Sequence, residues 1–169
     1  MPIFPLFAAL ALLPSPATGE KPMTAQTEPL VLEGSWEMTA AYEILADGTR
    51  VTNYSEHPHG LMMIDRDGRY TIQIFRPDRP RFASGDKTRG TAEEYRTAVL
   101  GSSTHFGRVQ ALPDGRTLIF DVEAASFPNW EGKQQRREYS FRDGVLSYAV
   151  PASASGNGTI AWSLWRKLR

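Results

Sequence analysis

Hydrophobic and polar side chains alternate along most of the chain from residue 32 onward. In the first such stretch the apolar side chains fall on one face: Trp36, Met38, Ala40 and Tyr42. Successive side chains of a β-strand point to opposite faces, so a period of two predicts strands with one buried face. The pattern predicts strands over residues 36–43, 50–54, 60–64, 70–76, 104–112, 116–123, 134–142, 145–150 and 159–166.

Tight turns separate many of these strands. The Asp-Gly and Asn-Gly pairs lie at Asp47-Gly48, Asp67-Gly68, Asp114-Gly115, Asp143-Gly144 and Asn157-Gly158. Such pairs favour hairpins because two-residue turns need positive φ. Consecutive hairpins form an antiparallel meander, and closure into a barrel removes its exposed edges. The sequence therefore predicts an all-β, up-and-down barrel of about eight strands, a size that side chains can fill or that can hold one small ligand.

One segment departs from the alternation and predicts a short helix. Thr91 and Glu94 form a capping-box pattern, and Gly101 is a helix stop after Leu100. The predicted apolar stripe of this helix is Tyr95, Ala98 and Val99.

The N-terminal segment has the pattern of a targeting signal. Residues 3–13 are an apolar run too short to span a membrane, and small residues suited to cleavage follow up to Gly19, although no Lys or Arg follows Met1. We therefore expect a signal peptide over residues 1–19, a linker over 20–31 and the barrel domain over 32–169. This organisation predicts a secreted or periplasmic protein; without a signal peptide, the protein would be cytoplasmic.

Composition narrows the function classes. The chain has 19 basic and 19 acidic residues and a net charge of +0, which argues against a general nucleic-acid partner. Without cysteine it has no disulfides, thiolate metal sites or cysteine nucleophiles. His57-Pro58-His59 is interpreted as a structural loop, so no metal site is predicted. No cofactor fingerprint is present, and we expect no cofactor.

Several motifs resemble the lipocalin-like domain family. Gly34-Ser35-Trp36 resembles the G-x-W signature of the first lipocalin strand, and Arg166 resembles the basic residue that closes the barrel over a tryptophan. Longer matches lie at residues 79–86, 90–95, 105–107 and 126–132. The resemblance covers residues 32–166 and implies a small calyx-like barrel whose family activity is not settled. Family members carry a histidine where this chain has Asp121, so any role of that position is in doubt.

Three groups of residues are candidates for a site. A basic group at Arg76, Arg79, Arg81, Lys87 and Arg89 could bind a ligand's anionic group at the barrel mouth, or could be a solvated loop paired with Asp78 and Asp86. His105 could act as a general base with Glu123 or Asp121, which lie across a predicted hairpin from it, or be a buried histidine bonded to a neighbour. The loop 126–132 could be a lid or a rigid plug. The predicted ligand-binding residues are Tyr70, Arg76, Arg79, Arg81, Tyr95, His105, Phe106, Phe127, Asn129, Trp130 and Arg136.

These residues leave three functions open. The first is a binding protein for one small hydrophobic molecule, either neutral or anionic. The second is an isomerase or cyclase acting on a hydrophobic substrate inside the barrel, with His105, Glu123 or Tyr70 moving a proton. The third is a structural domain with a filled core, in which Tyr139 and Trp162 pack with the other aromatic residues. The sequence favours the first over the enzyme and leaves the oligomeric state open.

Overall fold

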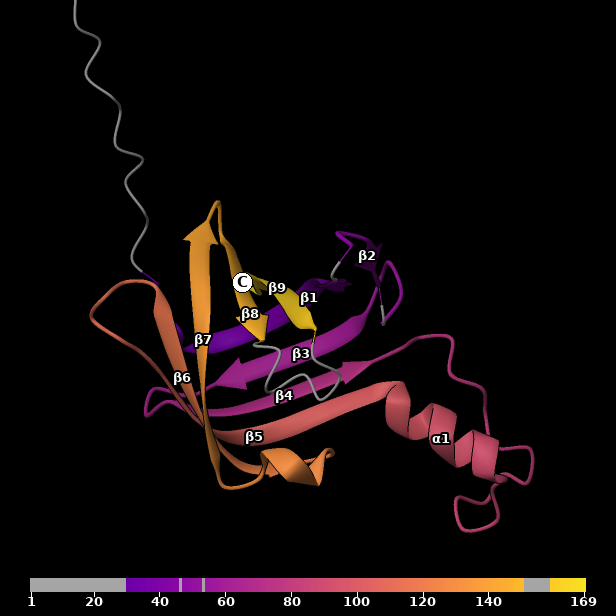
Figure 1. The fold of residues 1–169 in the computed structure, drawn as a ribbon. Helices are drawn as coiled ribbons and strands as arrows, with labels where there is room; N and C mark the ends of the chain where they lie inside the picture. The colour runs from indigo at the N-terminus through magenta and orange to yellow at the C-terminus, as the bar shows by residue number, and fades with distance from the viewer. Residues whose placement is uncertain (1–29, 46, 53, 151–158) are drawn as a thin grey trace, which may run out of the picture.

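The chain folds into a closed antiparallel β-barrel with one helix outside its wall (Figure 1). The computed structural model describes residues 30–45, 47–52, 54–150 and 159–169. In the described residues the elements are β1 (Gly34–Ile44), β2 (Arg50–Val51), β3 (His59–Ile64), β4 (Arg69–Phe75), α1 (Ala92–Leu100), β5 (Ser102–Ala111), β6 (Thr117–Ala125), the 3₁₀ turn η1 (Pro128–Trp130), β7 (Lys133–Arg142), β8 (Val145–Val150) and β9 (Ile160–Lys167). The signal peptide predicted over 1–19 and the turn predicted at Asn157-Gly158 lie outside them.

β1 closes the barrel because it pairs with β3 on one side and with β9, the last described strand, on the other. Its first residues pair with β3, with Trp36 opposite Met62, and its whole length pairs with β9, ending with Ile44 opposite Ile160. Every other long strand pairs with its neighbours in chain order, so the meander is continuous. The predicted all-β, up-and-down barrel is confirmed. β2, however, is only two residues long in the described part of the predicted strand 50–54.

One end of the barrel is closed by large apolar side chains. Trp36, Trp165 and Leu146 are fully buried there. The indole nitrogen of Trp36 donates to the carbonyl oxygen of Leu32 at 2.9 Å, which ties the segment before β1 across this end. The basic residue that covers Trp36 is Lys167, whose Nζ lies 5.4 Å from the ring centroid. The role predicted for Arg166 was therefore wrong, because Arg166 faces outward on β9 and is exposed.

A β-bulge in the wall depends on Gly107. The β5–β6 register shifts between Phe106 and Gly107, and Glu123 is the extra residue on β6. A Cβ on Gly107 would collide with the carbonyl oxygen of Asp121, so only glycine lets the two backbones approach this closely. The bulge leaves His105 inside the barrel and Glu123 outside it.

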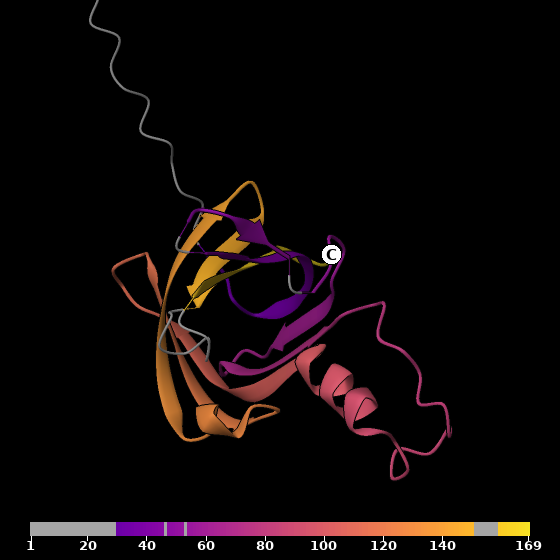
Figure 2. The same ribbon diagram turned by 45° about the vertical axis from the view of Figure 1, so that its right-hand side comes forward.

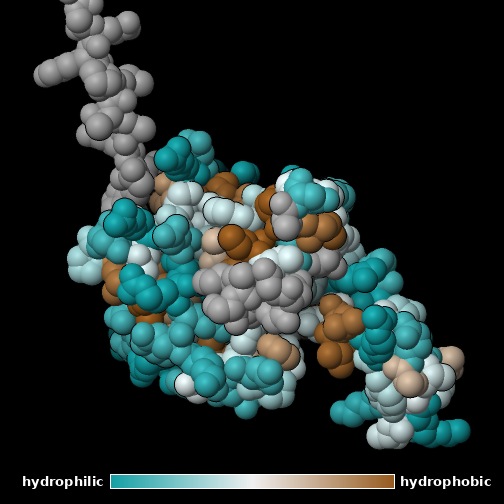
Figure 3. Space-filling view, viewed as in Figure 1, coloured by the Kyte–Doolittle hydropathy of each residue, from teal (hydrophilic) through white to brown (hydrophobic). Residues whose placement is uncertain are grey.

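Residues 76–101 form an arm that projects from one side of the barrel (Figures 1 and 2). The predicted capping box is present: the backbone of Glu94 donates to the Thr91 hydroxyl, and the Glu94 carboxylate accepts from the Thr91 backbone at 2.7 Å. The helix buries none of its residues, and Val99 of the predicted apolar stripe is 63% exposed. Figure 3 shows hydrophobic surface on the part of the arm next to the barrel and hydrophilic surface farther out.

Candidate functional site

A pocket opens at the barrel end opposite Trp36. It is formed where β1, β4 and β8 end and where β5 and β9 begin. Its cavity volume is about 100 Å³, and the space between its lining side chains is about 630 Å³ when open solvent is included. Its lining is aromatic and small apolar with a few polar groups: Ala41, Tyr42, Glu43, Tyr54, Ile74, Ser103, His105, Trp130, Arg137, Tyr148, Val150, Ala161, Trp162 and Ser163. This combination is typical of small-molecule sites.

Arg137 is the most unusual residue of this lining. It lies on β7 with 2% of its surface exposed, and its guanidinium stacks on Phe120 at 4.2 Å and on Tyr148 at 5.1 Å. One terminal nitrogen donates to Gln135 Oε1 at 2.7 Å, while Nε has no partner among the described residues. No salt bridge of the described residues includes Arg137. Burial lowers the pKa of this guanidinium, although the neighbouring tyrosines oppose the shift.

His105 and Tyr70 form a buried hydrogen-bonded pair beside Arg137. The Tyr70 hydroxyl lies 2.8 Å from His105 Nδ1, and the two rings meet edge to face. Burial, reinforced by the Arg137 charge, holds the pKa of His105 well below its usual value of 6.5. Burial also raises the pKa of Tyr70, so the phenol keeps its proton at neutral pH. We infer a neutral imidazole that accepts from Tyr70 and carries its own proton on Nε2.

Aromatic rings form the walls of the pocket. Tyr42 and Trp162 stack with their planes 18° apart and their centroids 6.5 Å apart. Trp130, from η1, packs edge to face on His105 with centroids 5.4 Å apart. Aromatic rings attract each other in offset and edge-to-face arrangements, so walls of this kind suit flat apolar groups.

Comparison with known proteins agrees with this architecture. The sequence profile described as "Lipocalin-like domain" matches residues 33–168. The chain belongs to the lipocalin-like domain family. It is also 30% identical over 107 residues to the 4'-hydroxy-3'-methoxypropiophenone carrier protein of Aspergillus oryzae, an alignment that covers 58% of this chain and 96% of the relative. The resemblance predicted from the sequence motifs is thus confirmed.

The lipocalin-like barrel brings three of the predicted site residues together: Tyr70, His105 and Trp130. It does not bring the predicted arginines to the pocket. Arg76 forms an ion pair with Asp78 at 2.9 Å, and Arg79 bonds Ser102 Oγ at 2.8 Å while lying over Phe75. Arg81 is exposed on the arm. Of the two expected local pairings, that with Asp78 is present, whereas Asp86 accepts from Thr88 instead.

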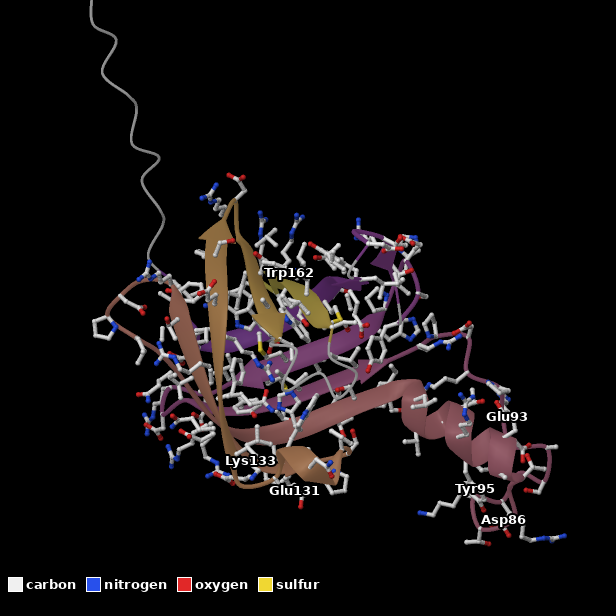
Figure 4. The ribbon with its side chains drawn as sticks, viewed as in Figure 1. Asp86, Glu93, Tyr95, Glu131, Lys133 and Trp162 are labelled. Atoms are coloured by element: carbon white, nitrogen blue, oxygen red, sulfur yellow. The ribbon has the colours of Figure 1, made fainter. Side chains whose placement is uncertain are left out.

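The other predicted ligand contacts also lie outside the pocket. Tyr95 is on the arm, well away from Trp162 (Figure 4), and its hydroxyl donates to the Lys87 carbonyl at 2.9 Å. Phe106 is 45% exposed on the outer face of β5, and Arg136 and Asn129 are exposed too. Phe127 touches Trp130 but is 39% exposed. The loop 126–132 therefore contributes one ring, that of Trp130, to the pocket.

The predicted carboxylate partners of His105 lie on the outside of the barrel. Glu123 pairs with Arg69 at 3.0 Å, and Asp121 accepts from Gln134 at 2.9 Å. The carboxylate that does line the pocket is Glu43, which accepts from Thr159 at 2.7 Å. Among the described residues, no group of three or more His, Asp or Glu side chains is placed to hold a metal ion. No helix in the described ranges is long and apolar enough to cross a membrane.

The sequence interpretation missed Arg137, although the signal was present. Arg137 shares a strand face with Tyr139 and Phe141, while Arg136 falls on the opposite, polar face. A single arginine on the apolar face of a strand predicts a buried charge, and buried charges are rare unless they are paired. Arg136 was predicted to contact the ligand, whereas β7 directs the side chain of the next residue, Arg137, into the barrel.

Proposed function

We propose that this lipocalin-like protein is a carrier that binds one small hydrophobic molecule with an aromatic ring in the pocket at the open barrel end. The observation that carries the proposal is the pocket wall, in which Tyr42, Trp162 and Trp130 present aromatic surface to a space that other described side chains leave open. Ligand sites combine such walls with a few directed polar groups.

The relative from Aspergillus oryzae supports this proposal. Its name describes it as a carrier of 4'-hydroxy-3'-methoxypropiophenone, an aromatic ketone with a phenol group. A molecule of that character suits a pocket with aromatic walls and buried polar groups at its base. The match covers 96% of the relative and 58% of this chain, so the likeness concerns nearly the whole of that protein and a part of this barrel.

The two other functions have less support. A filled core describes the closed half of the barrel but not the half that contains the pocket. Of the three residues expected to move a proton, His105, Glu123 and Tyr70, the bulge at Gly107 leaves Glu123 outside the barrel and ion-paired. His105 is instead bonded to Tyr70, a neutral group with a raised pKa.

The test is a binding measurement with the mature protein. We expect 4'-hydroxy-3'-methoxypropiophenone to quench tryptophan fluorescence saturably, with one site by calorimetry. Trp162→Ala should weaken binding about five- to tenfold, the size of one aromatic contact. Phe106→Ala, on the outer face of β5, is the matched control and should leave binding unchanged. Native mass spectrometry of protein purified gently from its host should show a reproducible extra mass.

Two results would overturn the carrier proposal. One is a bare protein mass together with no saturable binding of small aromatic compounds. The other is binding that Phe106→Ala weakens and Trp162→Ala does not, because the ligand would then sit on the outside of the barrel. We further propose that the carrier is exported, which amino-terminal sequencing of the mature protein from its host would test; a mature chain beginning at Met1 would refute export.

A further inference from the structure

Among the described residues, the buried cation of the pocket, Arg137, has no buried anion beside it. Arg137 is 2% exposed, and the groups that interact with its charge are the phenols of Tyr148 and Tyr70. Both phenols are neutral at neutral pH, since burial raises the pKa of each. His105 is neutral as well. In the described part of the chain, the base of the pocket therefore carries one uncompensated positive charge.

A buried charge without a compensating anion lowers the stability of the ligand-free protein. Moving a guanidinium out of water costs several kcal/mol, and pairing with an anion or with hydrogen-bond acceptors offsets this cost. Stacking on Phe120 and Tyr148 offsets part of it, and the bond to Gln135 offsets another part. Nε still lacks an acceptor among the described residues. An anionic group in the pocket, which Arg137 lines, would supply the missing negative charge.

We propose that the ligand class is an aromatic carboxylate, bound with its carboxylate on Arg137 at the base of the pocket and its ring between Trp162 and Trp130. This inference rests on the proposed carrier function and adds the charge of the ligand and its orientation. A guanidinium recognises a carboxylate well because its planar N–H fork matches the two oxygens.

The positions of Glu43 and Arg137 in the pocket set the orientation of the ligand. Glu43 lines the pocket at the end of β1, near the opening, and its carboxylate would repel an acidic group there. Arg137 stacks on Phe120, a core residue that is 1% exposed, so it lies at the inner end. The acidic group of the ligand therefore enters first. The arm residues Arg76 and Arg79 take no part, because their guanidinium groups are already bonded within the arm and to Ser102.

The experiment compares three probes of nearly equal shape: cinnamate, cinnamamide and methyl cinnamate. Binding to the full-length mature protein is measured by calorimetry at neutral pH. We expect cinnamate to bind about ten- to a hundredfold more tightly than the amide or the ester, the contribution of a charged hydrogen bond. Arg137→Met should remove this preference and leave amide binding nearly unchanged. Arg136→Met, the same replacement one residue earlier on the exposed face, should keep the preference intact.

The outcomes separate this inference from the carrier proposal. Equal binding of the three probes in the native protein would overturn the anion inference and leave the carrier standing. No binding of any aromatic probe would overturn both. A preference for cinnamate that survives Arg137→Met but is lost in Arg76→Met would move the anion site to the arm and refute the assignment to Arg137. Circular dichroism on each variant confirms that the barrel is intact, and Arg137→Lys, which keeps the charge, should retain part of the preference.

Discussion

The two ends of the barrel contain similar aromatic residues, but these residues are buried to different extents. At the closed end Trp36 and Trp165 are fully buried; the Trp36 indole N–H is satisfied by Leu32, while Trp165 Nε1 has no hydrogen-bond partner among the described residues. At the open end Trp162 and Trp130 are only partly buried, and they border a pocket that contains a buried arginine with an unsatisfied Nε. Tryptophan side chains thus stabilise the closed end by their burial, and at the open end they border a pocket.

This contrast assigns stability and binding to different parts of one continuous sheet. Burial of large apolar side chains is the main favourable contribution to folding, and the closed end has the two tryptophans that are fully buried, Trp36 and Trp165. A buried charge without a partner opposes folding, and the open end has it. Sites that bind ligands are often less stable than the scaffold that holds them. Variants at the two ends should therefore differ in which property they change.

The largest expected effect is that of Trp36→Ala. We expect it to lower the free energy of unfolding by about 3 to 5 kcal/mol, because it removes a fully buried indole from the closed end. Trp162→Ala, the same replacement at the open end, should cost clearly less, since Trp162 is only partly buried. Urea unfolding followed by circular dichroism measures both. Equal losses of unfolding free energy for the two variants would show that the open end contributes as much to stability as the closed end.

The next prediction is that a substitution of Arg137 raises the free energy of unfolding instead of lowering it. We expect Arg137→Met to raise the free energy of unfolding of the ligand-free protein by about 1 to 2 kcal/mol. The gain comes from removal of a desolvated charge, and the loss of the donor to Gln135 reduces it. Arg136→Met is the matched control and should change stability little. A loss as large as that of Trp36→Ala would mean that Arg137 is a structural part of the core.

The third effect is a dependence of stability on pH. His105 has a pKa in the folded state well below its usual 6.5. Above pH 6.5 both states are neutral at this residue, and stability is at its full value. As the pH falls below that value the unfolded chain takes up a proton that the folded barrel rejects, so stability falls, by at most about 1.4 kcal/mol per pH unit.

Thermal unfolding at a series of pH values checks this dependence. His105→Gln should flatten the loss of stability on the acid side of pH 6.5, whereas His59→Gln, at an exposed position on β3, should not. If the acid slope were identical in the native protein and in His105→Gln, the neutral buried imidazole would have no part in it.

The sequence predicted the barrel well because its signals are local. Alternation of apolar and polar residues places the strands, and pairs such as Asp67-Gly68 place the turns. The hairpin β3–β4 follows from them, with Gly60 opposite Ile74. The capping box at Thr91 and Glu94 is also local, and it marks the start of α1 correctly.

The site was predicted only in part because its geometry depends on contacts distant in sequence. His105 and Tyr70 meet through the β4–β5 pairing, which the meander implies. Glu123 was expected beside them, but the bulge at Gly107 shifts the register, and the clash that makes this glycine necessary is with the backbone of Asp121 on another strand. The arm arginines resembled a binding group because no local pattern shows whether a loop folds over the mouth or away from it.

The smallest effect tests whether the arm is independent of both barrel ends. The α1 cap depends on Thr91, whose hydroxyl accepts from the Glu94 backbone at 3.2 Å, and the helix itself has no buried residue. We expect Thr91→Ala to destabilise the helix locally by about 1 kcal/mol. Hydrogen exchange should then be faster at the α1 amides while the amides of β1 and β9 keep their protection. Urea unfolding of the barrel and probe binding should not change. If the barrel midpoint or the affinity for cinnamate fell with the helix, the arm would support the open end through the Arg79–Ser102 bond.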